Sequence, residues 1–109
     1  MLVNKNMIVK FLMDSGAQCN VISKRDYESC TNRNQRTLKK TNIRLKTYGG
    51  FSINPLGETW LHCNRNGNKK KLKFLVVNNE CSPILGVDAC QQMKFIKFID
   101  SDMNEVRKN

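Results

Sequence analysis

Turn-forming clusters divide this chain into short apolar runs, and their spacing of about ten residues constrains the fold more than any other feature. The runs are rich in Ile, Val, Leu and Phe, which favour extended strands. No low-complexity linker or internal repeat separates them, and 109 residues fit one domain of the usual size of roughly 100–150 residues. We therefore expect a single, mostly-β domain over residues 1–109.

Two β-hairpins are predicted by segments of alternating polarity that flank glycine turns. Gly49-Gly50 is the turn of the first hairpin, which is polar on one face and is expected to project from the domain. In the second hairpin, Asn66-Gly67 supplies the positive φ that a tight turn requires. The predicted strands are Asn42–Tyr48 with Phe51–Ile53, and Glu58–Cys63 with Lys71–Val77 across Asn64–Asn68.

The remaining segments predict short elements around these hairpins. Met7–Met13 is a compact apolar run that predicts one strand leading into a turn at Asp14. Ser23 is a candidate N-cap, so Ser23–Cys30 is expected to form a short helical turn. The other expected elements are a strand at Val21–Ser23, an exposed loop at Asn32–Lys40, a short helix at Val87–Met93, a closing strand at Phe95–Ile99 and a frayed tail over residues 100–109.

The formal net charge of +10 predicts attraction to polyanions, which defines a class of partner and not a function. The Lys and Arg residues are scattered, with little aromatic interleaving of the kind that single-strand binding surfaces use. A solvated polar surface is the favoured interpretation, and nucleic acid stays open as a partner. No stretch approaches the roughly 20 apolar residues of a membrane span, and the N-terminus lacks the pattern of a secretory signal. We expect a soluble, intracellular protein without a membrane partner.

The cysteines predict neither a disulfide framework nor a zinc site. There are five of them, and none belongs to a Cys-x-x-Cys pair. The single histidine, His62, adjoins Cys63, and neighbouring side chains of a strand point to opposite faces. We therefore expect no metal and no cofactor.

One acidic residue is a candidate for chemistry. Asp14 follows an apolar run and precedes Ser15-Gly16, where a carboxylate has no evident reason to face solvent. A buried carboxylate in such a place is a candidate functional group. The alternative interpretation is an ordinary Asp that bonds its own backbone at the turn.

Three motifs in a particular order carry a family resemblance. An apolar strand leads into Asp14-Ser15-Gly16-Ala17, a glycine-tipped hairpin follows at Tyr48–Phe51, and Ile84–Asp88 places two apolar residues and a glycine before a helix. The series resembles the retropepsins, the aspartic proteases of retroviruses and LTR retrotransposons, over about residues 7–99. The segments Ala17–Ser23 and Ile84–Asp88 look most like those of gypsy-like retrotransposon proteases. The resemblance implies an all-β, small, closed barrel-like retropepsin fold with one short C-terminal helix, assembled as a homodimer.

The resemblance also implies a role for the motif around Asp14. Asp-Ser-Gly occurs once in the chain, so the second catalytic carboxylate would come from the Asp14 of another copy. Ser15 would hydrogen-bond across the dimer, and Gly16 would let the backbone approach the carboxylates closely. The implied reaction is cleavage of a polypeptide by an activated water, and the implied substrate is the parent Gag–Pol polyprotein.

The other motifs would complete the site. Gly49 and Gly50 would form the tip of a flap over an extended peptide, with Tyr48 beside the cleft. Ala17 would line an apolar substrate pocket, although a core position is the plainer interpretation. The implied structural motif consists of Ile84, Leu85, Gly86 and Asp88, with Asp88 capping or bracing the helix.

Two features depart from the family pattern and keep alternatives open. Only residues 1–6 precede the expected catalytic strand, so the N-terminal strand is expected to be truncated. The chain also ends in a charged segment where family dimers interleave terminal strands. The alternatives are a catalytically silent retropepsin fold that dimerises or binds peptides, a relative acting in the ubiquitin pathway, and a basic nucleic-acid-binding β domain. The family resemblance places an active protease in the cytoplasm or within retroelement particles.

Overall fold

The structure, a computed structural model, describes residues 1–5, 7–14, 16–46, 50 and 52–95. Its strands are β1 (Leu2–Val3), β2 (Met7–Ile8), β3 (Leu12–Met13), β4 (Asn20–Ser23), β5 (Leu45–Lys46), β6 (Ser52–Ile53), β7 (Gly57–Arg65), β8 (Asn68–Val77) and β9 (Ile84–Leu85). Its helices are α1 (Lys24–Cys30), the 3-10 turn η1 (Arg33–Gln35) and α2 (Val87–Gln92). The expected fold class, mostly β with a short helix near the C-terminal end, is confirmed.

The β7–β8 hairpin is the centre of the main sheet. Its turn is tight because Asn66 and Gly67 both take positive φ, 52° and 86°, which lets Arg65 pair directly with Asn68. The strands therefore run closer to the turn than the sequence predicted. Seven strands lie in the order β2-β1-β7-β8-β4-β9-β3, and the sheet curls into a half-barrel. Strands β5 and β6 form a separate two-stranded sheet within the first predicted hairpin. Its first strand is shorter than predicted, because residues 42–44 lie outside β5, and residues 47–49 and 51 lie outside the described part of the chain.

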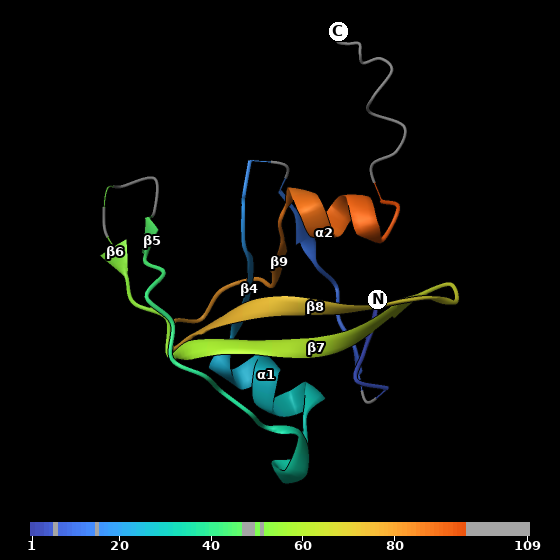
Figure 1. Cartoon of the computed structure of the whole chain (residues 1–109), viewed down its shortest axis with the longest axis horizontal. Helices are drawn as coiled ribbons and strands as arrows, with labels where there is room; N and C mark the ends of the chain where they lie inside the picture. The colour runs from blue at the N-terminus through green and yellow to red at the C-terminus, as the bar shows by residue number, and fades with distance from the viewer. Residues whose placement is uncertain (6, 15, 47–49, 51, 96–109) are drawn as a thin grey trace, which may run out of the picture.

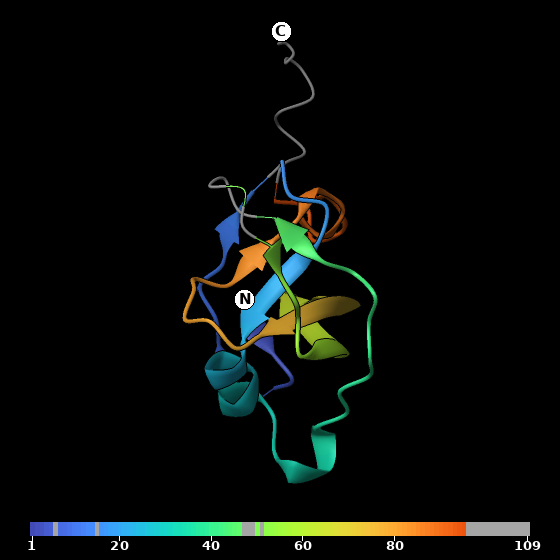
Figure 2. The ribbon, with the colours of Figure 1, turned by 90° about the vertical axis from the view of Figure 1, so that its left-hand side faces the viewer.

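The helices lie on opposite sides of the central hairpin. Helix α2 and the β5–β6 hairpin are on one side of the β7–β8 ribbon, and α1 is on the other (Figure 1). The view turned by 90° shows the same separation (Figure 2). Within the described part of the chain, no helix is long and apolar enough to cross a membrane. The side that carries α2 and the hairpin is the side on which the candidate site is built.

The core lies where the central hairpin meets β4, β9 and α2. The largest fully buried side chains include Ile22, Leu61, Phe74, Leu85 and Met93, one from each of these elements or their ends. Alternation along β7 places Leu61 and Cys63 inward and Trp60 and His62 outward. Burial of these apolar side chains is the main stabilising term of so small a domain.

The segment before Asp14 corrects one prediction. Met7–Met13 does not form one continuous strand, because its two halves have different partners: β2 pairs with β1, and β3 pairs with β9. Val9 between them is buried and donates its backbone N–H to the carbonyl of Met1 at 2.8 Å. Strand β3 is exposed at both residues.

Two other expected segments differ in detail. The loop at Asn32–Lys40 contains the turn η1, and Lys39 forms an isolated antiparallel bridge to Glu58 of β7. The predicted closing strand at Phe95–Ile99 falls outside the described residues except for Phe95, which lies in a bend over the guanidinium of Arg65. The predicted tail over residues 100–109 also lies outside the described residues.

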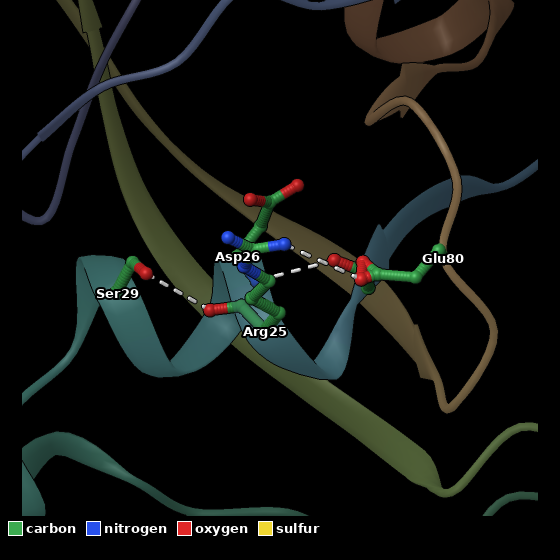
Figure 3. Close-up of polar contacts among 5 residues, drawn as sticks. Arg25, Asp26, Ser29 and Glu80 are labelled. Carbon is green, nitrogen blue, oxygen red and sulfur yellow. Dashed lines mark hydrogen bonds and ion pairs between the residues drawn. The ribbon is translucent and has the colours of Figure 1, made fainter.

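Helix α1 begins directly after Ser23, as the candidate N-cap predicted. The hydroxyl of Ser23 accepts a hydrogen bond from the backbone N–H of Asp26 at 3.1 Å, which satisfies one donor of the first turn. Tyr27 and Cys30 then face the core. On the exposed side, Arg25 reaches Glu80 in the segment that joins β8 to β9, at 3.7 Å (Figure 3). Both side chains are mostly exposed, so this pair adds little to stability.

Two buried thiols predict a loss of stability at high pH. Burial raises the pKa of Cys63 from its ordinary value of 9.0 to about 12, and that of Cys30 to about 11. The folded state holds these protons more tightly than the unfolded state, so the stabilisation is complete below pH 9 and is lost as the pH rises toward 11–12. The free energy of unfolding, measured in urea at a series of pH values, should fall above about pH 9. Cys63→Ala should reduce this slope, and an unchanged slope would contradict the assignment.

Candidate active site

Asp14 lies at the end of β3, and pairing with β9 fixes its backbone. The two strands are parallel, with Leu12 opposite Ile84 and Met13 opposite Leu85. The N–H of Leu12 donates to the carbonyl of Pro83 at 2.8 Å, and that of Asp14 donates to the carbonyl of Leu85 at 3.0 Å. Two segments whose paired residues are 72 positions apart in the chain are thereby joined at the candidate catalytic residue.

The loop after Asp14 folds back on the carboxylate. The N–H of Gly16 donates to Asp14 Oδ1 at 2.9 Å, and the N–H of Ala17 donates to the carbonyl of Asp14 at 3.0 Å. A Cβ on Gly16 would lie 3.3 Å from the same Oδ1, so glycine is what allows this approach. Ser15, the expected partner across a dimer, lies outside the described residues.

Gly86, the glycine of the Ile84-Leu85-Gly86 motif, packs closely against the loop that follows Asp14. Gly86 is buried, and a Cβ there would lie 2.8 Å from the carbonyl oxygen of Ala17 and 3.1 Å from the backbone nitrogen and oxygen of Cys19. The next residue, Val87, donates its N–H to that same Ala17 carbonyl at 2.9 Å. The backbone of Gly86 and Val87 is therefore in direct contact with the backbone of the loop that follows Asp14.

The β5–β6 hairpin is the segment in which a flap was predicted. Leu45 pairs with Ile53 and Lys46 with Ser52, and the hairpin stands on the same side of the central ribbon as α2 (Figure 1). Gly50 is exposed with φ of +84°, a conformation that glycine adopts without strain. Tyr48 and Gly49, which were also predicted to contact substrate, lie outside the described residues.

A solved structure has the same fold as this chain. The chain superposes on the EIAV protease, solved in complex with the inhibitor HBY-793, with a TM-score of 0.70. The match covers 85% of this chain and 83% of that protein at 24% sequence identity. The fold is that of a retropepsin. No family model and no curated protein matches the sequence itself.

The retropepsin fold leaves Asp14 half-buried within one chain, beside exposed apolar side chains. Leu12 is 58% exposed and Met13 is 48% exposed, although both precede the candidate catalytic residue directly. The carboxylate was expected to be buried, but in the single chain Asp14 is only partly buried and the strand before it is exposed. Apolar exposure of this kind, next to a functional residue, is typical of a surface that another molecule covers.

The thiol of Cys90 is buried, and its pKa is affected by the carboxylate of Asp14. Cys90 of α2 is buried, and burial raises the pKa of its thiol, with a further contribution from the negative charge of Asp14. The thiol donates to the carbonyl of Leu85 at 3.6 Å, the residue that also accepts the N–H of Asp14. A protonated Cys90 is thus part of the packing behind the site and is not a nucleophile.

Asn20 is a positioning residue that the sequence analysis did not single out. Its Oδ1 accepts the N–H of Gly86 at 2.8 Å, and its Nδ2 donates to the carbonyl of Lys73 at 2.9 Å. One side chain therefore joins β4, β8 and Gly86. The available signal was an amide residue directly before the apolar pair Val21-Ile22, where a polar side chain needs a buried partner.

Asn20→Ala should lower the free energy of unfolding by about 1–2 kcal/mol, because it removes the side-chain hydrogen bonds to the N–H of Gly86 and to the carbonyl of Lys73. Asn20→Asp keeps the acceptor and loses only the donor, so its loss should be smaller. Urea denaturation of the two variants and the native chain measures the difference. Equal losses in both would contradict the role given to the bond with Gly86.

The remaining predicted residues have structural positions. Ala17 is half-buried, and its carbonyl accepts Val87, which fits a supporting role as well as a pocket wall. Asp88 is exposed in the first turn of α2, where its negative charge interacts favourably with the helix dipole. It is not the cap, because Gly86 holds the N-cap position and makes no side-chain cap bond. Among the described residues, no cluster of His, Cys, Asp or Glu could hold a metal ion.

Proposed function

We propose that this chain is one subunit of a homodimeric aspartic endopeptidase. The observation that carries the proposal is the position of Asp14, held at the end of β3 by the carbonyl of Leu85 and bonded to the N–H of Gly16, within a retropepsin fold. A carboxylate fixed by backbone groups at the edge of an uncovered apolar surface is well placed for chemistry on a bound molecule.

The proposed reaction requires two carboxylates and one water. Two Asp14 side chains brought together by two-fold symmetry cannot both be ionised, so the pair shares a proton, as the paired carboxylates of aspartic proteases do. The ionised member takes a proton from water as the water attacks the scissile carbonyl carbon. The protonated member donates its proton to the carbonyl oxygen, and a neutral tetrahedral diol forms without a covalent enzyme adduct. Its collapse, with proton transfer to the nitrogen, releases the amine.

The exposed residues Leu12 and Met13 favour dimerisation as the step that completes the site. They lie directly beside Asp14, so covering them would remove apolar surface from water and place the carboxylate in a drier environment. We propose that a second copy and the bound peptide together provide that cover. The β5–β6 hairpin would close over the peptide and pair with it as an added strand.

The proposed substrate is a polypeptide in extended conformation. On the resemblance of Ala17–Ser23 and Ile84–Asp88 to gypsy-like retrotransposon proteases, we propose the parent Gag–Pol polyprotein as the natural substrate, cleaved in the cytoplasm or in retroelement particles. The pocket-lining role of Ala17 and the flap role of Tyr48, Gly49 and Gly50 belong to the same proposal.

The test is cleavage of a broad peptide library at mildly acidic pH over a range of protein concentrations. An active homodimer predicts a rate that rises faster than linearly with concentration below the dimer dissociation constant, and inhibition by pepstatin. Sedimentation of the same samples gives the fraction of dimer. A chain that is dimeric and cleaves no peptide would instead be the silent form of the fold, a dimerisation or peptide-binding module.

A further inference from the structure

The outward face of the β7–β8 hairpin carries an aromatic and basic surface that the proposed protease does not use. Trp60 lies opposite Lys73, His62 opposite Lys71, and Asn64 opposite Lys69, so all six side chains share one face. Trp60 is 51% exposed, although its side chain is large and mostly apolar. We call this surface the Trp60 face. The sequence did not reveal it because Trp60 and Lys73 are 13 residues apart in the chain and become neighbours only through the strand register.

Three residues of the Trp60 face, Trp60, Lys71 and Lys73, line a pocket. The pocket has a volume of about 450 Å³, and Trp60, Lys71 and Lys73 line it together with Gln18, Ile43 and Gln92. Helix α2 and the segment after Asp14 thus form one wall, and the segment leading to the β5–β6 hairpin contributes another. An exposed aromatic ring in the lining of an open groove, with amides and ammonium groups in the same lining, suits a planar polar ligand that carries negative charge.

The charge of the hairpin is strongly positive. Residues 57–77 contain five basic side chains, from Arg65 to Lys73, and one acidic side chain, Glu58. Glu58 pairs with Lys73 at 3.7 Å, so one lysine is partly neutralised, and Asp88 adds a negative charge on the wall of the groove. Lys69 and Lys71 have no ion-pair partner among the described residues. They are two residues apart on one strand, which places them about 7 Å from each other along the edge of the groove.

We propose that the Trp60 face binds single-stranded nucleic acid. A base stacks on the indole of Trp60, and Lys69, Lys71 and Lys73 contact the phosphates on either side of it. Stacking on an aromatic ring tolerates any base, and lysine contacts to phosphate carry no sequence information, so binding is predicted to be general for single strands. The proposal does not depend on Asp14 or on dimerisation, and it assigns a binding role to three of the basic side chains of this chain.

The chain offers a direct readout, because Trp60 is its single tryptophan. Titration of Asp14→Asn protein with a 12-nucleotide uridylate RNA at low salt should quench the indole fluorescence as the base stacks. Three phosphate contacts predict that the logarithm of the affinity falls with the logarithm of the salt concentration with a slope of about −2. The Asp14→Asn background keeps the result separate from the proposed protease activity.

Variants locate the site by anisotropy of a labelled RNA, which does not need the tryptophan signal. The double variant Lys69→Gln and Lys71→Gln should weaken binding and make the salt slope about 1.4 units shallower, because two contacts of about 0.7 each are lost. Trp60→Ala should weaken binding by about tenfold, and Trp60→Phe by less, since a phenyl ring still stacks. The matched control removes two exposed lysines elsewhere, Lys10→Gln and Lys24→Gln, and should change the affinity less than twofold.

Three results would overturn the proposal. RNA binding that falls equally in the control and in the Lys69 and Lys71 variant would show diffuse attraction to net charge. Binding without quenching of Trp60 would remove the stacking contact. An oligo-glutamate peptide of equal charge that quenches Trp60 and binds as tightly as the RNA would identify the face as a site for acidic peptide instead.

Discussion

Replacing Asp14 by asparagine should lower the rate of peptide hydrolysis by at least about 10³-fold, because general acid–base groups contribute roughly 10²–10⁴ and this change removes both roles at once. Asparagine has the shape of the native side chain, and its amide oxygen can still accept the N–H of Gly16, which is 2.9 Å from Oδ1 in the native chain. The measurement is the initial rate on a cleaved library peptide at a protein concentration where the native chain is dimeric.

The control for this variant is Glu28→Gln. Glu28 is an exposed carboxylate on α1, so the substitution makes the same chemical change away from the candidate site. It should leave the rate within a factor of about two of the native value, since surface substitutions of this kind have small effects. If Asp14→Asn retained the native rate while folded and dimeric, the cleavage would have another origin and Asp14 would not be its catalytic residue.

Gly86→Ala should destabilise the domain by about 2–3 kcal/mol and lower the rate of the folded protein by about 10²-fold. The added Cβ would meet three backbone atoms of the catalytic loop, the Ala17 oxygen at 2.8 Å and the Cys19 nitrogen and oxygen at 3.1 Å. Backbone atoms cannot rotate away as a side chain can, so the loop must shift. The shift is transmitted to Asp14 because Ala17 donates its N–H to the carbonyl of Asp14.

Two measurements separate these effects of Gly86→Ala. Urea denaturation gives the loss of stability. The rate of hydrolysis at 10 °C, at a protein concentration where the variant is folded and dimeric, gives the loss of activity. Ser82→Ala, an exposed position in the same segment, should change neither quantity. A variant that is destabilised but fully active would show that the motif supports the fold and does not position Asp14.

The predictions from sequence were confirmed where the conformation of a short segment depends on residues within that segment. Asn66-Gly67 specifies a tight hairpin through the φ values that it tolerates, and Ser23 specifies the start of α1 through one side-chain bond. The three ordered motifs indicated the retropepsin fold for the same reason, since each is a local pattern. The identity of Asp14 as the residue to test rests on that order of motifs.

Tertiary structure decided what depends on pairing between distant segments. The division of Met7–Met13 into two strands follows from which partner each half meets, and a run of apolar residues does not encode that choice. The role of Asn20 arises only when β8 and Gly86 arrive on either side of it. Trp60 and Lys73 likewise become one surface through register. The sequence by itself determined the turn at Asn66-Gly67, the Ser23 cap and the candidate carboxylate, because those depend on residues near in the chain. The exposure of the apolar residues beside Asp14, and the groove over Trp60, were decided by long-range packing.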